Sequence, residues 1–369
     1  MEIDIYTEFN NDLENIWTNF EKNAVMTPFQ SYGWLSYWQH TVGGPLLSVQ
    51  PRIIHLHKKG NTIAILPMGI RRILGLRILE WLGFKQADYM GPLLISNFDK
   101  KNYNENTWEL IRSNISGVDV IHLRKQFKQT VSFIEGVNFF GSSYQKLKAN
   151  KILLLDNWDE YFGNIRKKLR SDSQRQRRRL EEIGKVNFNI SERAEGNTKI
   201  IQSMITQKSR RYRETGLMDM LAVKEYQQFY QGLGVVSFDN MKVHCAALCV
   251  GDVMVATHVG IVDKDTFYYL MPANKGGNWK KYSPGRLLLI ELINWAMQNK
   301  LKFFDFTVGD ETYKKDWCNI ETDLFDIRKV VTPIGLFYIF ALYINLFVKK
   351  VSFLQNIVKK YINNFKMNK

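Results

Sequence analysis

The most informative pattern of apolar and polar positions lies between residues 282 and 317. Apolar side chains recur there at steps of three and four, which predicts a helix that begins at Pro284 and ends near Asn299. A short apolar run at 303–306 follows and predicts a buried strand, in which Asp305 is the one charged residue. A polar loop at 309–315 comes directly after it.

The start of this helix has the composition of an anion-binding turn. Ser283 suits the cap, Pro284 suits the first helical position, and Gly285 lets a ligand approach the backbone closely. The free N–H groups and the positive dipole end favour an anion such as a pyrophosphate. The phosphate contacts that we expect are Tyr282, Ser283, Gly285, Arg286 and, from the polar loop, Lys314.

The pattern DFxxGxExYKxxW resembles a known family. It is present as Asp305, Phe306, Gly309, Glu311, Tyr313, Lys314 and Trp317, with YSPGRLLL upstream. Together these residues resemble the CelD/BcsL family of acetyltransferases, which is linked to cellulose and exopolysaccharide synthesis and belongs to the GNAT superfamily. A weaker resemblance at Pro28, Phe29, Gln30 and Trp34 extends it over most of residues 25–330. The resemblance implies acetyl-CoA or another acyl-CoA as donor, and an amino group of a sugar or glycan precursor as acceptor.

The resemblance also implies an α/β (α+β) fold of two tandem GNAT-like domains, each a mixed central sheet flanked by helices. An internal similarity agrees with it, because NTIAILPMGI at 61–70 reads like DVMVATHVGI at 252–261. The run at 118–123 is similarly placed to the strand of Asp305, and 89–94 to 282–287. We predict an acceptor-side domain at 1–150, a domain with the acyl-CoA site at 151–332, and a helical tail at 333–369.

Acyl transfer from a thioester to an amine needs a base, a donor to the carbonyl oxygen and often an acid for the thiolate. His258, alone in the strand VMVATHVGIV, is a candidate base, or else a core histidine. Asp305 is a candidate to orient His258 or to bind the amine of the acceptor. Glu311 is a candidate to act as the base through a water molecule. Alternatively, both acids could belong to a structural network at the end of the strand. Tyr313 is a candidate to protonate the thiolate or stack on the cofactor, or else a packed surface tyrosine.

Other reaction classes lack support in the sequence. Cys245, Cys249 and Cys318 form no C-x-x-C pair, so we expect neither a disulfide framework nor a metal site. No GxxxxGK[ST] or clean GxGxxG motif is present. The amino terminus has acidic residues and no apolar run of the kind found in secretory signals, so we expect a cytoplasmic protein.

The charge of the chain favours polyanionic partners. Its 369 residues carry a formal charge of +15, which suits cofactor phosphates, nucleotide-sugars, nucleic acid or an anionic membrane. A predicted helix at 161–183, stopped by Gly184, has a strongly basic face. That face is either a solvated surface or the sign of a Fem-type aminoacyl transferase, which also pairs GNAT-like domains and draws its donor from charged tRNA. Apart from that tRNA, nucleic acid is not an expected partner.

The carboxyl-terminal segment differs from the rest of the chain. Its apolar run at 334–348 is shorter than the roughly twenty residues of a bilayer span, and Lys349 and Lys350 follow it. We expect a helix that lies on the inner face of the cytoplasmic membrane or docks on the protein body. A catalytically silent, membrane-associated subunit of a polysaccharide synthase is the alternative from a different class.

Overall fold

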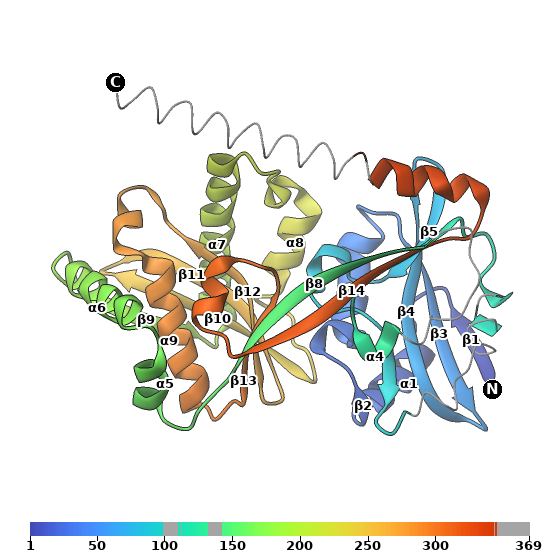
Figure 1. Ribbon diagram of the computed structural model, residues 1–369, viewed down its shortest axis with the longest axis horizontal. Helices are drawn as coiled ribbons and strands as arrows, with labels where there is room; N and C mark the ends of the chain where they lie inside the picture. Colours follow the sequence, from blue (N-terminus) through green and yellow to red (C-terminus); the bar gives the residue numbers. More distant parts are fainter. Residues whose placement is uncertain (99–109, 112, 132–141, 343, 345–369) are drawn as a thin grey trace.

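The computed structural model describes residues 1–98, 110–111, 113–131, 142–342 and 344. Two lobes lie side by side, joined by two long strands that run between them (Figure 1). The described strands form one 14-stranded sheet with the order β1-β3-β4-β5-β7-β14-β8-β13-β12-β11-β10-β9, while β2 and β6 pair off this path. The strand order consists of two similar halves that run in opposite directions along the sheet, with β14 and β8 between them.

The first half is an antiparallel ladder that ends in a parallel pair. β1 and β3, β3 and β4, and β4 and β5 pair antiparallel, and β5 pairs parallel with β7. The strands are β1 (Glu2–Tyr6), β2 (Ala24–Val25), β3 (Gln50–Lys58), β4 (Asn61–Ile73), β5 (Leu76–Trp81), β6 (Leu93–Ile95) and β7 (Val120–Phe127), and the helices are α1 (Asn11–Glu21), α2 (Tyr32–Trp38) and α4 (Lys128–Val131).

The second half repeats this plan. β9, β10, β11 and β12 pair antiparallel in turn, and β12 pairs parallel with β13. The strands are β9 (Val186–Ser191), β10 (Met241–Val250), β11 (Val253–Asp263), β12 (Thr266–Asn274) and β13 (Phe303–Val308), and the helices are α5 (Trp158–Asn164), α6 (Lys167–Glu181), α7 (Ala194–Thr215), α8 (Lys224–Gly232) and α9 (Pro284–Gln298).

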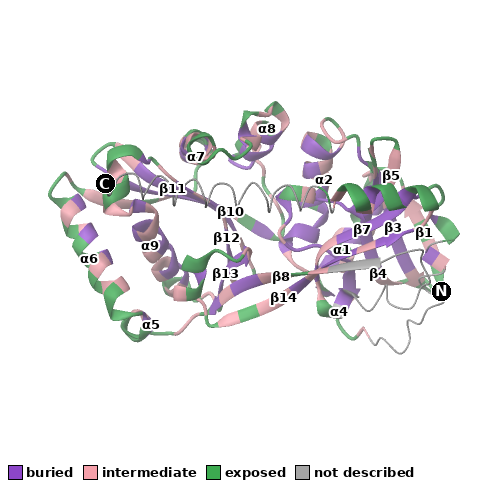
Figure 2. Cartoon of the chain, turned by 45° about the horizontal axis from the view of Figure 1, so that its top comes forward, coloured by how far each residue is buried: buried purple, intermediate pink, exposed green. Residues whose placement is uncertain are grey.

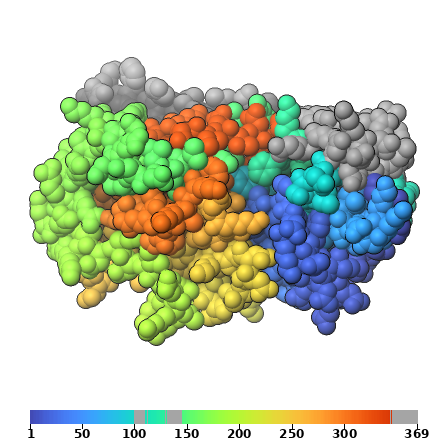
Figure 3. Space-filling view, turned by 90° about the horizontal axis from the view of Figure 1, so that it is seen from below, coloured from blue at the N-terminus to red at the C-terminus, as the bar shows by residue number. Residues whose placement is uncertain are grey.

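The halves exchange their last strands. β8 (Ser142–Leu153) pairs with β13 of the second half, and β14 (Ile320–Val330) pairs with β7 of the first. The two strands also pair with each other, from Ile320 opposite Lys151 to Lys329 opposite Ser142. In the space-filling view the two halves pack against each other along a continuous boundary (Figure 3). The predicted tandem α/β fold with mixed sheets is therefore confirmed, and β4 and β11 occupy equivalent places, as do β7 and β13.

The central strands of the second half are buried on both faces. Along β10, Cys245 and Ala247 belong to one hydrophobic core with α7, while Ala246 and Leu248 belong to another with α9. This follows from the two-residue period of a strand between two helical layers. Figure 2 shows buried residues along the strands and exposed residues on the outer faces of the helices.

Two local expectations differ from the structure. The helix predicted over 161–183 is two helices, because Ile165 is extended (ψ 143°) and buries its side chain, so the chain turns between α5 and α6. The segments 89–94 and 282–287 also differ in conformation, since the first contains the short strand β6 while the second leads into α9.

The chain is helical again over residues 336–342, and this segment docks on the first half. The hydroxyl of Tyr338 lies 2.8 Å from Nδ1 of His122, and its ring packs with Ile78 and Val120. Phe337 and Phe340 remain 70% and 66% exposed. Residues 345–369, and with them most of the predicted tail, lie outside the described residues. No helix among the described residues has the length and apolar character needed to cross a membrane.

Candidate active site

The site begins where β12 and β13 diverge. Their parallel pairing covers only Thr266–Tyr268 opposite Phe303–Asp305. Beyond it both strands line a cavity of about 280 Å³. β12 contributes Tyr269, Leu270, Met271 and Pro272, and β13 contributes Phe306, Thr307 and Val308. Two parallel strands that separate leave backbone N–H and C=O groups without a strand partner, and such groups can bind a ligand.

The opposite walls of this central cavity come from the first half and from α7 and α8. The first half contributes Phe29, Trp34, Lys85, Gln86 and Asp88, and the helices contribute Lys208, Tyr212 and Tyr230. Nε1 of Trp34 is a buried donor without a hydrogen-bond partner in the described part of the chain. A ligand oxygen that accepted from it would remove the cost of leaving it unpaired.

The polar loop forms part of the wall of this cavity. Glu311, Tyr313 and Lys314 all line it. The buried Nζ of Lys314 lies 2.8 Å from a carboxylate oxygen of Glu311 and donates to the carbonyl of Val308 at 3.2 Å. Gly309 permits this arrangement, since a Cβ there would lie 2.3 Å from Glu311 and 2.6 Å from Lys314. Burial raises the pKa of the Tyr313 phenol well above its usual value.

Asp305 lies beside the central cavity but does not line it. One carboxylate oxygen accepts from the hydroxyl of Tyr89 and from the backbone N–H of Thr307, both at 2.7 Å. Burial raises the pKa of Asp305 to about 6, against the lowering effect of these two hydrogen bonds. The carboxylate borders a separate, smaller cavity of about 120 Å³ together with Tyr89 and Lys151. Asp305 therefore joins the two halves through a buried contact.

His258 lies in the core of the second half. Its side chain is fully buried, neither ring nitrogen has a hydrogen-bond partner in the described residues, and the ring stacks on Tyr269 with centroids 4.5 Å apart. Burial holds its pKa well below the usual value. The neighbouring Val259 and Gly260 line the central cavity, whereas His258 does not. This geometry matches the core interpretation of the residue.

The chain continues from the end of β12 through the 3-10 helix Gly277–Tyr282 to the start of α9. Ser283 has a left-handed φ of 49°, and Pro284 is buried at the first helical position. A Cβ on Gly285 would lie 3.7 Å from the side-chain nitrogen Nδ2 of Asn274, the last residue of β12. Arg286 forms an ion pair with Asp172 of α6, and Arg179 of the same helix lies over the ring of Tyr282 at 5.3 Å. The expected phosphate contacts of this turn thus lie apart from the central cavity, under the basic helix α6.

Several residues that line the cavity were not among the predicted site residues, and Asp88 and Lys208 are two of them. Asp88 accepts from the hydroxyl of Thr307 at 2.9 Å and pairs with Lys125 at 3.2 Å. Lys208 donates to the carbonyl of Pro272 at 3.2 Å, and burial lowers its pKa to about 8. The sequence did offer a signal for Lys208, because Lys208, Arg210, Arg211 and Arg213 form a basic cluster on a predicted helix that could face the acceptor entrance. Asp88 follows a strand of the other half and had no such signal.

The sequence comparison agrees with the position of this site. Residues 167–315 match the family model described as an acetyltransferase (GNAT) domain. The second half contains a GNAT acetyltransferase domain. The match runs from α6 to the polar loop and includes the parts of β12 and β13 that line the cavity. The chain is therefore a transferase of the GNAT type. No curated protein matches the chain in sequence.

Solved structures share the architecture of both halves. The crystal structure of FemX is similar with a TM-score of 0.59 at 10% identity, over 92% of this chain and 99% of that one. A conserved protein of unknown function from Bacteroides thetaiotaomicron has a TM-score of 0.54 at 10% identity, over 89% and 100% of the chains. L-PGS from Bacillus licheniformis has a TM-score of 0.52 at 11% identity, over 93% and 98%. At these identities the similarity is one of fold.

Proposed function

We propose that the protein transfers an acyl group from an acyl-CoA to an amino group of a sugar or glycan precursor. The observation that carries this proposal is the divergence of β12 and β13 into a cavity closed on its other side by the first half. The pantetheine arm would pair with the unpaired strand edges as an added strand does. Its phosphates would reach the start of α9, with Ser283, Gly285 and Arg286 as contacts. The domain limits at 150 and 332 are part of the same proposal.

The walls of the cavity support an amine acceptor. The carboxylates of Asp88 and Glu311 would attract an ammonium group, and the rings of Trp34, Tyr212 and Tyr230 offer surfaces for a sugar. The acceptor must lose a proton to become a nucleophile. Glu311, positioned by Lys314, would take it through water, and its exposed side chain is accessible to water.

In the proposed reaction, the neutral amine attacks the thioester carbon, a C–N bond forms and the C–S bond breaks. Glu311 passes the first proton on to solvent and then receives the second, which the nitrogen loses as the amide forms. Tyr313 would donate a proton to the departing thiolate and regain one from solvent, and its raised pKa keeps the phenol protonated until then. Asp305 keeps the β13 arm against Tyr89 of the first half. No step uses His258.

The test of the donor is a thermal-shift panel with free CoA, acetyl-CoA, longer acyl-CoAs and charged tRNA. We expect CoA and its thioesters to raise the melting temperature, because a ligand that binds only the folded state stabilises it. Acetyl-CoA with glucosamine and other amino sugars should then release free CoA thiol. No shift with any CoA compound, and no thiol release, would contradict the proposal.

One observation favours an aminoacyl-tRNA donor as the second candidate. The exposed Lys167, Lys168 and Arg178 of α6 have no ion-pair partner within the described ranges, and they lie on the helix above the start of α9. A basic surface of this kind suits a nucleic acid backbone. Strongly salt-dependent tRNA binding without CoA binding would select this Fem-type reaction over the first.

We also propose that the protein works in the cytoplasm, against the inner face of the membrane. Phe337 and Phe340 form an exposed apolar pair beyond the docked face of the 336–342 helix, and Lys349 and Lys350 follow in the sequence. Aromatic side chains beside basic residues suit an anionic interface. Flotation with anionic vesicles should exceed flotation with neutral ones and fall in the double variant Phe337→Ser and Phe340→Ser; equal flotation in all cases would contradict it.

A further inference from the structure

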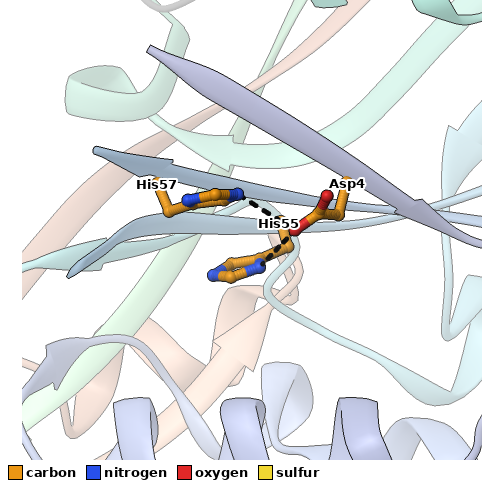
Figure 4. A group of neighbouring side chains, drawn as sticks. All are labelled: Asp4, His55 and His57. Carbon is orange, nitrogen blue, oxygen red and sulfur yellow. Dashed lines mark ion pairs between the residues drawn. The ribbon is translucent and has the colours of Figure 1, made fainter. Parts of the chain in front are cut away.

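A second cluster of chemically active side chains lies at the edge of the sheet, on strands β1 and β3. Asp4 stands directly opposite His55 in the antiparallel register, and Glu2 stands opposite His57. Alternate residues of a strand share one face, so the two acids and the two histidines point to the same side. Figure 4 shows the carboxylate of Asp4 beside the two imidazole rings, with a dashed line to each ring. β1 is the first strand of the sheet order, whereas the central cavity lies at the divergence of β12 and β13.

Both histidines have a ring nitrogen close to the same carboxylate oxygen of Asp4. Nε2 of His57 lies 3.0 Å and Nδ1 of His55 lies 3.4 Å from the same carboxylate oxygen of Asp4. One ligand atom from each of the three residues lies within 4.8 Å of the others. In tetrahedral coordination with bonds of roughly 2.0–2.1 Å, neighbouring ligand atoms are roughly 3.3–3.4 Å apart. The two separations from Asp4 are close to that value.

The environment of His55 fixes its orientation toward Asp4. Nε2 of His55 lies 2.9 Å from the hydroxyl of Thr62, while Nδ1 is buried and has no hydrogen-bond partner in the part of the chain that the structure describes. The side chain is only 7% exposed, and its ring stacks on that of His57 with centroids 4.7 Å apart. A hydrogen bond from the outer ring nitrogen is the usual way in which proteins orient a metal-binding imidazole.

We propose that Asp4, His55 and His57 bind a divalent transition metal ion, with Zn²⁺ as the best-suited ion. Two imidazole nitrogens and one carboxylate oxygen are a ligand set that this ion takes readily, with a fourth position left for water. Glu2, which lies 3.4 Å from Nδ1 of His57, would orient that ring from outside. The ion would hold the edge strand β1 on β3, a role separate from acyl transfer.

Calorimetry tests the site on the full chain without an affinity tag, after dialysis against EDTA. Titration with ZnCl₂ should give one tight site per chain. Asp4→Asn and His57→Gln should each lower the affinity at least tenfold, because each removes one of three ligands. Circular dichroism would show that both variants are folded, and the exposure of Asp4 makes its replacement the safer of the two.

The matched control is His40→Gln. His40 is exposed, lies outside the cluster and has Nδ1 2.7 Å from the carbonyl of Ser36, so Zn²⁺ binding should be unchanged in this variant. With Zn²⁺ present, backbone amides of β1 should also exchange with solvent more slowly. Equal affinity in the wild type, Asp4→Asn and His57→Gln, or no binding at micromolar Zn²⁺, would overturn the proposal. So would a Co²⁺ spectrum with thiolate absorption, which would place the ion at a cysteine.

Discussion

Each half contains an equivalent pair of parallel strands, but the gap beyond the pairing is filled by the chain in the first half and is a cavity in the second. In the first half, β5 and β7 pair only at Ile78 with Val120 and at Leu79 with Ile121, and the chain then folds back into the gap. There Met90 bridges to Gln126, and its N–H donates to the carbonyl of Lys125 at 3.1 Å. In the second half, β12 and β13 separate after three residue pairs, and the gap is a cavity.

The difference depends on the segment that follows the fourth strand of each antiparallel ladder, β5 in the first half and β12 in the second. In the first half Gly83 has a left-handed φ of 96°, and the chain turns into the 3-10 helix Phe84–Gln86 and back to the gap. In the second half the corresponding segment runs through Gly277–Tyr282 to α9. The segment that closes the first gap also provides Gln86 and Asp88 as a wall of the second cavity. One copy of the fold thus shapes the site of the other.

The largest effect on donor binding and turnover should come from filling the gap between β12 and β13, as the chain fills the gap between β5 and β7. Leu270→Trp places a bulky ring on the β12 arm, where the half-buried leucine lines the cavity. We expect acyl-CoA affinity and turnover to fall more than 100-fold, because the ring occupies the space of the ligand. Leu74→Trp, at an exposed turn of the first half, is the control and should retain both. Unchanged binding in Leu270→Trp would show that the donor binds elsewhere.

The next effect concerns the polar loop, whose Gly-x-Glu-x-Tyr-Lys sequence does not occur in residues 1–150. Glu311→Gln removes the proposed base and should lower kcat by about 10²-fold. The glutamine oxygen can still accept from the buried Lys314, so the melting temperature should change little. Asp310→Asn, an exposed neighbour that pairs with Lys315 at 3.4 Å, is the matched control. Equal activity of both variants would remove the catalytic role from Glu311.

A smaller effect separates the structural from the catalytic role of Asp305. Its pKa is raised from 3.8 to about 6 by burial, so the folded state binds the proton more tightly than the unfolded state. The contribution of Asp305 to the free energy of unfolding is therefore fully present below pH 4. About 2 to 3 kcal/mol of it is lost as the pH rises through 6. Asp305→Asn keeps an oxygen for Tyr89 and Thr307 but does not titrate.

The measurement is urea unfolding of the wild type and of Asp305→Asn from pH 4 to pH 7. We expect the variant to gain stability relative to the wild type across this range and to retain acyl transfer. A difference in unfolding free energy that does not change with pH would contradict the assigned burial effect. Loss of turnover in a stable variant would instead give Asp305 a direct catalytic role.

The smallest effect concerns the charge of Lys208. Burial lowers its pKa to about 8, so its ammonium group is present in the cavity at pH 7 and largely lost at pH 9. Binding of an anionic donor should weaken several-fold across this interval in the wild type, and Lys208→Met should remove the pH dependence. Lys199→Met, on the exposed face of α7 and paired with Glu195, is the control and should behave as the wild type.

Local periodicity predicted those parts of the site that one segment builds. The helix from Pro284, the strand with Asp305 and the loop from Gly309 each follow from neighbouring residues, and the equivalence of β4 and β11 followed from a repeated pattern. The sequence placed His258 in a strand, but it could not say which face of that strand meets the cavity and which meets α9.

Contacts between distant segments could not be predicted in this way. The hydrogen bond of Tyr89 to Asp305 joins residues of different halves, and the exchange of β8 and β14 depends on strand pairing over the whole sheet. The cluster of Asp4 and the two histidines could not be predicted either, because only the register of β1 and β3 brings Asp4 to His55. Cysteine spacing, on which the expectation of no metal rested, carries no information about such a site.

Hydrogen exchange with and without acetyl-CoA tests the central claim most directly, because it reports each gap separately. The account predicts slower exchange of amides in 269–274 and 306–308 when acetyl-CoA binds, and unchanged exchange in 83–90. Slower exchange in 83–90, with no change in the two arms of β12 and β13, would contradict it.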